Sequence, residues 1–304
     1  MEENKTITNS TSFALASKAK DYFLLIKFTL SFMVVFSTVI SYLLAPNVSF
    51  DINKVLLLFA GGMLVTGAAN GINQILERKT DAMMKRTQKR PIASGRMSVT
   101  EGWVFVTIAA VVGCAIMYSF SMEAAALSFF SLLLYGFVYT PLKKVNSIAV
   151  LMGAIPGALP CLIGWVASFE PGYPKDWTGG WILFAIQFLW QFPHFWAIAW
   201  VAHKDYSEAG FKLLPSDKGP TKFTALQTIM YSSMMIPVGV LPYYYHMSGI
   251  TSMWICFGCN LYMVFVSIQL FRKMDVASAR KVMFSSYFYL MIVFLSLYAD
   301  KVRL

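Results

Sequence analysis

The stretch 70–96, NGINQILERKTDAMMKRTQKRPIASGR, concentrates side chains whose types and spacing could do chemistry. Two amides and two carboxylates recur at i, i+3, i+7 and i+11, as Asn70, Asn73, Glu77 and Asp81. In a helix, this spacing places all four on one face, with neighbours about 5–6 Å apart. Their oxygens suit Mg²⁺, which proteins usually hold with one or two carboxylates plus substrate phosphates. The pattern therefore predicts a site for a metal diphosphate.

Basic residues follow this acidic face directly, as Lys85, Arg86, Lys89 and Arg90. Arginine binds phosphate oxygens in a bidentate fashion, so Arg86 and Arg90 are interpreted as diphosphate contacts. Pro91 and Gly95 predict the end of the helix. A second interpretation stays open for the basic residues, because Lys/Arg clusters beside a membrane commonly set topology and bind anionic head groups.

A second polar cluster lies within 190–219, WQFPHFWAIAWVAHKDYSEAGFKLLPSDKG. Lys204 and Asp205 stand where an apolar segment ends, and they repeat the chemistry of the first cluster. One interpretation makes Lys204 a phosphate contact and Asp205 a further metal ligand. The alternative is a solvated helix end in which Asp205 and Glu208 form an exposed carboxylate pair. The presence of the first cluster favours a shared site.

His194 is different, because it lies about halfway along the apolar segment that precedes Lys204. A histidine inside a membrane span must hydrogen-bond, ligate a metal or shuttle protons. A purely structural histidine remains an alternative, since Pro193 frees a backbone carbonyl for a partner. Lys143, at the end of another apolar segment, either extends to lipid head groups or adds charge to a diphosphate pocket.

The elements that must position these residues are membrane spans. The chain has 304 residues, is 57% hydrophobic and has a mean hydropathy of +0.59. A hydrocarbon core of about 30 Å needs about 20 apolar residues per helix. Segments of this kind cover 22–45, 55–74, 102–118, 124–140, 148–167, 181–202, 223–244, 253–271 and 282–298. We predict an all-α integral membrane protein with about nine transmembrane helices around a central cavity that opens to the cytoplasmic side.

The charge distribution predicts the orientation. A net charge of +10 would suggest nucleic acid in a soluble chain, but here it accumulates in alternate gaps between spans, so no nucleic-acid partner is expected. The positive-inside rule then places the N-terminus and the gaps after the second, fourth, sixth and eighth spans in the cytoplasm. Residues 1–20 are expected to form a disordered cytoplasmic tail, and 21–304 a single transmembrane domain.

Several motifs together point to a known family. Asn73-x-x-x-Glu77-x-x-x-Asp81, followed by Arg86-Thr87 and Arg90-Pro91, resembles the first motif of the intramembrane aromatic prenyltransferase superfamily. The segments YTPLK at 139–143, GAIPGALPCLIGW at 153–165, and WQFPHFW and KDYxxAG within 190–215 are similar to one branch, the protoheme IX farnesyltransferases or heme O synthases. The resemblance runs over about 20–300.

The resemblance implies transfer of a farnesyl group from farnesyl diphosphate to a vinyl group of heme B, giving heme O, in the cytoplasmic membrane if the source is bacterial. It also implies a site, with Mg²⁺ at Asn73, Glu77, Asp81 and Asp205, the diphosphate at Arg86, Arg90, Lys143 and Lys204, and heme at His194 and Trp196. Asn73, Glu77, Asp81, Lys204 and Asp205 would be the catalytic group. Delivery of the product to heme-modifying or oxidase assembly proteins is implied by the family alone.

The chain departs from the superfamily in two places. Glu77 stands where Asp is common, and the second motif has Asp205 without a second Asp four residues later, which argues against a two-metal arrangement. Two other functions remain to be weighed. Prenyl transfer to a quinone precursor would use the same chemistry, whereas a secondary transporter would place its charges mid-span rather than at span ends.

Overall fold

The computed structural model describes residues 17–46, 48–170, 172, 174–216 and 218–302, and within them every regular element is helical. The only strand-like pairing there is an isolated bridge between Ser248 and Lys301. Residues 1–16 of the predicted tail lie outside the described part. Residues 17–20, also assigned to the tail, instead form the start of a helix, Ser17–Leu25.

The helices follow one another along the chain as α2 (Phe28–Leu44), α3 (Ile52–Leu76), α4 (Arg78–Met83), α5 (Val99–Tyr118), α6 (Met122–Leu133), η1 (Leu134–Tyr139), α7 (Thr140–Leu142), α8 (Ala149–Val166), α9 (Thr178–Val201), α10 (His203–Glu208), α11 (Lys222–Tyr244), α12 (Ile250–Lys273) and α13 (Val276–Ala299). Within the described residues, eight helical segments are long and apolar enough to cross a membrane, with α6, η1 and α7 counted as one. Ser17–Leu25 and α2 make a ninth if the pair, bent by 51°, is one span. The prediction of an all-helical protein with about nine spans is confirmed.

Capping side chains at the polar edges set where several spans begin. Asp51 accepts hydrogen bonds from the amides of Asn53 and Lys54 at the start of α3. Ser98 and Asp275 cap α5 and α13 in the same way. Such caps satisfy amides that have no partner inside the helix. The caps therefore mark the points at which the chain turns back into the apolar layer.

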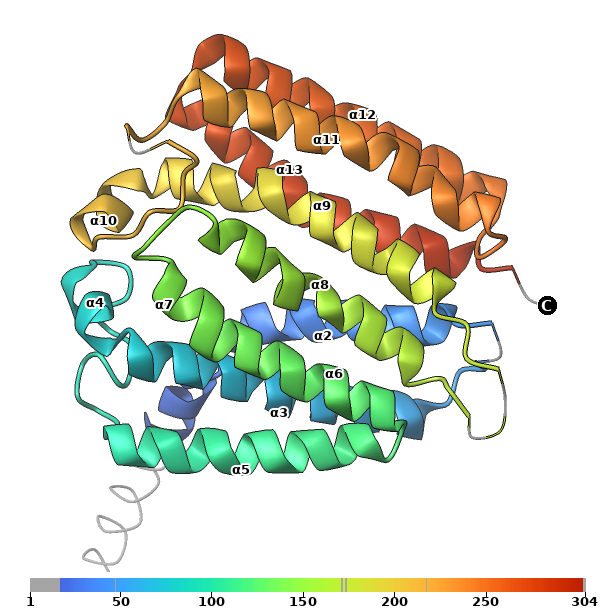
Figure 1. Cartoon of the computed structure of the whole chain (residues 1–304), viewed down its shortest axis with the longest axis horizontal. Helices are drawn as coiled ribbons and strands as arrows, with labels where there is room; N and C mark the ends of the chain where they lie inside the picture. The colour runs from blue at the N-terminus through green and yellow to red at the C-terminus, as the bar shows by residue number, and fades with distance from the viewer. Residues whose placement is uncertain (1–16, 47, 171, 173, 217, 303–304) are drawn as a thin grey trace, which may run out of the picture.

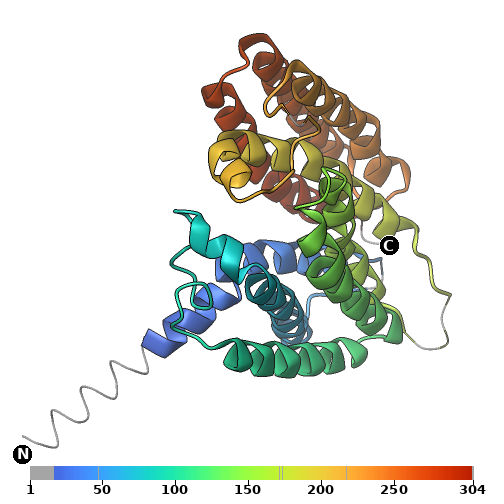
Figure 2. The same ribbon diagram turned by 60° about the vertical axis from the view of Figure 1, so that its left-hand side comes forward.

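The spans form two halves with the same order of neighbours (Figures 1 and 2). In the first half α3 packs against α2 and α5, and in the second half α9 packs against α8 and α11. Helix α8 joins the halves, because it also contacts α2 and α6. The two short helices α4 and α10 follow α3 and α9 and lie at the same end of the molecule (Figure 1).

Small residues and prolines let α8 pack closely, as its composition predicts. A Cβ on Gly164 would lie 1.9 Å from the carbonyl oxygen of Thr38 on α2. Pro160 cannot donate to the carbonyl of Pro156, and the Ser131 hydroxyl donates to that oxygen instead, at 3.3 Å. Helix α8 is thus a tightly packed wall between the two halves.

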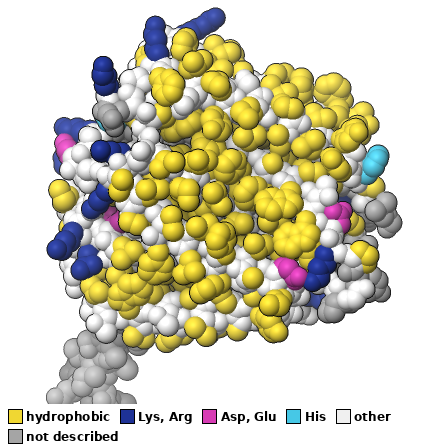
Figure 3. All heavy atoms as spheres, in the orientation of Figure 1, with side chains coloured by type: hydrophobic (Ala, Val, Ile, Leu, Met, Phe, Trp, Pro, Cys, Tyr) yellow, Lys and Arg dark blue, Asp and Glu magenta, His cyan; other side chains and the backbone are white. Residues whose placement is uncertain are grey.

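The surface separates apolar and charged side chains. In Figure 3, hydrophobic side chains cover the middle of the visible face, and Lys and Arg gather along the edge where Figure 1 shows α4 and α10. Both polar clusters predicted from the sequence therefore lie at one basic edge of the membrane domain.

Candidate active site at the ends of α3 and α9

The acidic face predicted from the sequence forms at the junction of α3 and α4. The helix breaks at Glu77 (φ −90°, ψ 5°). The backbone amide of Glu77 still donates to the Asn73 carbonyl at 2.9 Å, and the backbone amide of Asp81 donates to the Glu77 carbonyl at 2.8 Å. The helical repeat is kept, and Asn70, Asn73, Glu77 and Asp81 are all buried, at 6% exposure or less. The expected end at Pro91 was wrong, because α4 already ends at Met83 and the chain continues in turns.

Each predicted metal ligand on this face contacts one cation from another segment. The contacts are Lys27 Nζ to Asn73 Oδ1 at 2.9 Å, Lys143 Nζ to Glu77 Oε1 at 2.5 Å, and Arg90 Nη1 to the two carboxylate oxygens of Asp81 at 2.8 and 2.7 Å. Buried carboxylates need such partners, because desolvation of an unpaired charge is costly. The cluster is therefore a preassembled array of alternating charges.

Lys143 belongs to this array rather than to the lipid surface. It is 8% exposed, and its ammonium lies 4.9 Å from the ring centre of Tyr139 and 5.2 Å from that of Phe211. Burial lowers the pKa of Lys143, and the nearby Glu77 carboxylate opposes that shift. The structure thus places Lys143 beside the predicted ligands, which favours the interpretation that it adds charge to a diphosphate pocket.

Lys27 was not among the predicted site residues. It lies between Ser17–Leu25 and α2 in the left-handed conformation (φ 48°), at the 51° bend. The bend turns its side chain toward Asn73, whose amide nitrogen in turn donates to the Thr140 hydroxyl at 3.0 Å. The available signal was a lone cation inside an apolar segment, which is costly and by default functional.

The second polar cluster contributes differently from the prediction. Lys204 is exposed and Asp205 half-buried on α10, and neither side chain makes a hydrogen bond or ion pair with the described residues. No group of three Asp, Glu, His or Cys side chains in the described part is arranged to hold a metal. Instead, Arg86 donates to the Tyr206 hydroxyl at 3.0 Å, with its guanidinium 5.4 Å from the ring centre.

His194 and Trp196 face different neighbours. His194 is 8% exposed, stacks on Trp190 with ring centres 4.6 Å apart, and places Nδ1 2.8 Å from the Ser286 hydroxyl on α13. Trp196 instead packs against Phe192 and another aromatic ring, away from that contact. The structure does not bring the two predicted heme contacts together.

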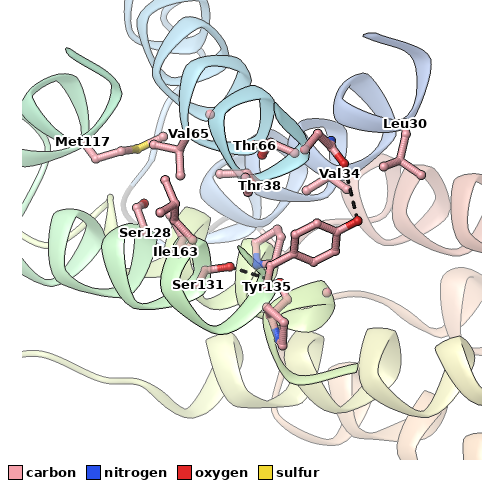
Figure 4. A pocket seen from close by; sticks show the side chains of 17 residues that line it. Leu30, Val34, Thr38, Val65, Thr66, Met117, Ser128, Ser131, Tyr135 and Ile163 are labelled. Atoms are coloured by element: carbon pink, nitrogen blue, oxygen red, sulfur yellow. Dashed lines mark hydrogen bonds between the residues drawn. The ribbon is translucent and has the colours of Figure 1, made fainter. Parts of the chain in front are cut away.

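A cavity of about 80 Å³ adjoins the acidic face (Figure 4). It lies among α2, α3, α5, α6, η1 and α8, and most of its lining is apolar, including Leu30, Val34 and Ile163. Asn70, one helical turn before Asn73, lies at its wall and accepts from the Tyr135 hydroxyl at 3.4 Å. The apolar cavity therefore begins about one helical turn from the polar array along α3.

The donor set fits a magnesium ion that arrives with a diphosphate. Asn73 supplies an amide oxygen and Glu77 and Asp81 supply carboxylates, all buried on one face, and Mg²⁺ completes its shell with phosphate oxygens and waters. Asp205 is not part of this set in the structure, since it lies on α10 without contact to the other ligands. The geometry suits chemistry in which an anionic leaving group departs beside a water-poor cavity.

Comparison with known proteins gives concordant results. Residues 34–294 match the UbiA prenyltransferase family. The chain is 42% identical to the protoheme IX farnesyltransferase of Cytophaga hutchinsonii, over 95% of this chain and 100% of that protein. These matches confirm the resemblance drawn from the motifs.

Solved structures share the fold. A chain from a study of digeranylgeranylglyceryl phosphate synthase in membranes superposes with a TM-score of 0.77 at 21% identity, covering 93% of this chain and 98% of that chain. A UbiA homolog from Archaeoglobus fulgidus bound to GPP and Mg²⁺ gives a TM-score of 0.67 at 15% identity, covering 91% and 99%. At such identities the superpositions establish the architecture alone.

Proposed function

This chain belongs to the UbiA prenyltransferase family, and from that premise we propose that it transfers a farnesyl group from farnesyl diphosphate to a vinyl group of heme B, giving heme O. It is an integral, multi-pass membrane enzyme. The observation that best supports the reaction is the buried array in which Asn73, Glu77 and Asp81 each contact a cation. Amide and carboxylate oxygens suit the metal, and the cations suit the diphosphate.

The charge balance favours a metal diphosphate over either component alone. Even without Lys27, the three cations Arg86, Arg90 and Lys143 outnumber the two carboxylates of Glu77 and Asp81, so the site is net positive. It therefore suits a complex whose diphosphate carries more negative charge than Mg²⁺ carries positive. Mg²⁺ held by Asn73, Glu77 and Asp81 would neutralise charge on the departing diphosphate. The cations, once exchanged from the carboxylates, would hold the phosphate oxygens.

Lys204 remains a proposed contact of the diphosphate, and Asp205 a proposed ligand of the metal. Both lie on α10, and neither side chain contacts the array in the structure.

The cavity beside Asn70, at about 80 Å³, is the proposed place for the part of the farnesyl chain nearest the diphosphate. Its apolar lining excludes water from the carbon that loses the diphosphate, so the allylic cation survives until the vinyl group attacks. A water molecule then adds to the resulting cation next to the porphyrin and loses a proton, which forms the hydroxyl group of the product. Tyr135, at the cavity wall, marks the boundary between the apolar chain and the polar array.

His194 is the proposed heme contact. The Ser286 hydroxyl donates to the Met283 carbonyl at 2.6 Å, so in its contact with His194 it accepts, and Nδ1 carries the proton. Nε2 then keeps its lone pair, and it has no hydrogen-bond partner among the described residues. A neutral imidazole with a free nitrogen is the form that binds heme iron. Trp196 would only pack against neighbouring aromatic side chains and would not contact the heme.

The protein is proposed to reside in the cytoplasmic membrane if its source is bacterial, with the N-terminus and the basic edge in the cytoplasm. The basic edge supports this orientation through the positive-inside rule.

The test uses purified full-length protein in detergent with farnesyl diphosphate, MgCl₂ and an acceptor. Heme B is offered in parallel with a hydroxybenzoate and a naphthoate, the acceptors of the alternative reaction. Farnesylated heme, identified by mass spectrometry, is the expected product. No heme product, together with a farnesylated benzoate or naphthoate, would contradict the proposal.

A further inference from the structure

The α3–α4 and α9–α10 junctions repeat one local geometry. Helix α3 breaks at Glu77 (φ −90°, ψ 5°) and α9 breaks at Ala202 (φ −98°, ψ 18°), and a six-residue helix follows each break. After each break the fourth residue donates its amide to the carbonyl of the break residue, Asp81 at 2.8 Å and Tyr206 at 3.0 Å. The two halves are therefore in a register that pairs Asp81 with Tyr206.

This backbone register differs from a match of the two polar clusters by residue type. Matching carboxylate to carboxylate pairs Asp81 with Asp205, but the backbone pairs Asp205 with Thr80. The residue that meets the first half is Tyr206, through Arg86. Its ring also packs edge-on against Phe211, with centres 5.8 Å apart, and Phe211 lies over the Lys143 ammonium.

The hydroxyl proton of Tyr206 is not used in a hydrogen bond to the described residues. Arg86 Nη2 donates to the phenol oxygen, so this bond uses a lone pair and leaves the phenol proton free. No acceptor for that proton lies among the described residues. The free O–H and the remaining guanidinium N–H groups of Arg86 thus lie side by side as hydrogen-bond donors.

We propose that Tyr206 is a substrate-binding residue whose hydroxyl donates to a diphosphate oxygen held by Arg86. The inference rests on the proposed function, since it assigns a further contact to the same diphosphate. A hydrogen bond from a neutral donor to an anion strengthens binding without adding charge. An aspartate at this register would repel the diphosphate unless another metal ion came with it. A phenol needs no such ion, so one Mg²⁺ per diphosphate suffices.

The test is the affinity of the full-length protein for farnesyl thiolodiphosphate, an unreactive analogue, measured by titration calorimetry with MgCl₂. Tyr206→Phe removes only the hydroxyl and keeps the ring beneath Arg86. We expect its dissociation constant to rise about tenfold or more, the scale of a lost hydrogen bond to a charged group. Tyr244→Phe, at a side chain exposed on α11, is the matched control and should bind as the parent does.

Two further readouts separate substrate contact from a structural role. The unfolding temperature and the heme B absorption spectrum of Tyr206→Phe should match the parent, and inorganic diphosphate with Mg²⁺ should lose affinity by the same factor as the analogue. Parent-like affinity in Tyr206→Phe would overturn the role of Tyr206 alone. Absence of analogue binding by the parent would overturn the diphosphate site itself, which is a different result.

Discussion

At the scale of single residues, the site is defined by pairs. The spacing of Asn73, Glu77 and Asp81 on one helix face could be predicted, because positions along a helix follow from its period. Their partners could not, since Lys27 and Lys143 come from distant segments that only the folded chain brings near. Arg90, assigned from its type to the diphosphate, forms an ion pair with Asp81.

Glu77 tests the proposed metal contact. Glu77→Gln keeps the size of the side chain but removes the charge that would bind Mg²⁺ and pair with Lys143. We expect turnover to fall by about 100-fold or more, the scale for losing one charge-stabilising group in a reaction of this kind. The measurement is the initial rate of diphosphate release in detergent. Glu123→Gln, at an exposed pair with Lys175, is the control, and equal rates in both variants would remove Glu77 from the site.

Lys143 predicts a pH dependence. Burial lowers its pKa, so the ammonium loses its proton at a lower pH than an ordinary lysine does. As the pH is raised, the affinity for the diphosphate analogue should therefore begin to fall at a lower pH than it would if the site lysine were exposed to solvent. Lys143→Arg should move this decline to higher pH, because guanidinium stays protonated. An alkaline limb at the same pH in both proteins would assign the titration to another group.

At the scale of elements, the positions of the helix breaks determine the geometry of the site more than the lengths of the helices do. The apolar runs predicted the spans because burial in lipid requires them. They did not predict the end of α4 at Met83, nor the backbone register in which Tyr206 corresponds to Asp81. Both depend on backbone geometry at Glu77 and Ala202, and neither residue is a turn former whose type would mark a break.

Glycines in α8 give an element-scale prediction. Gly164→Ala would place a methyl group against the Thr38 backbone, which cannot rotate away, so we expect a loss of about 1–3 kcal/mol in stability. The control is Gly258→Ala on α12, where the added Cβ meets nothing within 4 Å. That change should be neutral or slightly stabilising, because alanine favours a helix over glycine. Thermal unfolding in detergent measures both, and equal unfolding temperatures would contradict the tight α2–α8 contact.

At the scale of the whole molecule, two halves meet around one basic edge and one apolar cavity. Composition predicted the membrane architecture, and the repeated chemistry of the two polar clusters favoured a shared site. The start of the first span could not be predicted, because residues 17–21 are mostly polar and the helix Ser17–Leu25 is separated from α2 by the bend at Lys27. That bend is also what brings the unpredicted cation into the site.

The charge distribution predicts an orientation in the membrane. Nine spans with a cytoplasmic N-terminus place Leu304 outside, and Lys301 lies near the end of α2 that is farther from the basic edge, where its ammonium bonds the Leu43 and Ala45 carbonyls. Alkaline phosphatase fused after Leu304 should therefore be active and a cytoplasm-dependent fluorescent protein should not. The reverse pattern would require an even number of spans.

The central claim is farnesyl transfer to heme at the array of Asn73, Glu77 and Asp81. The most direct measurement is mass spectrometry of heme after incubation with farnesyl diphosphate and MgCl₂ in ¹⁸O-labelled water, for the parent and for Asp81→Asn. The parent is predicted to give heme bearing one farnesyl group and one labelled oxygen. Asp81→Asn is predicted to give at most traces, although its heme B spectrum matches the parent. Unmodified heme from the parent, or equal product from Asp81→Asn, would contradict the claim.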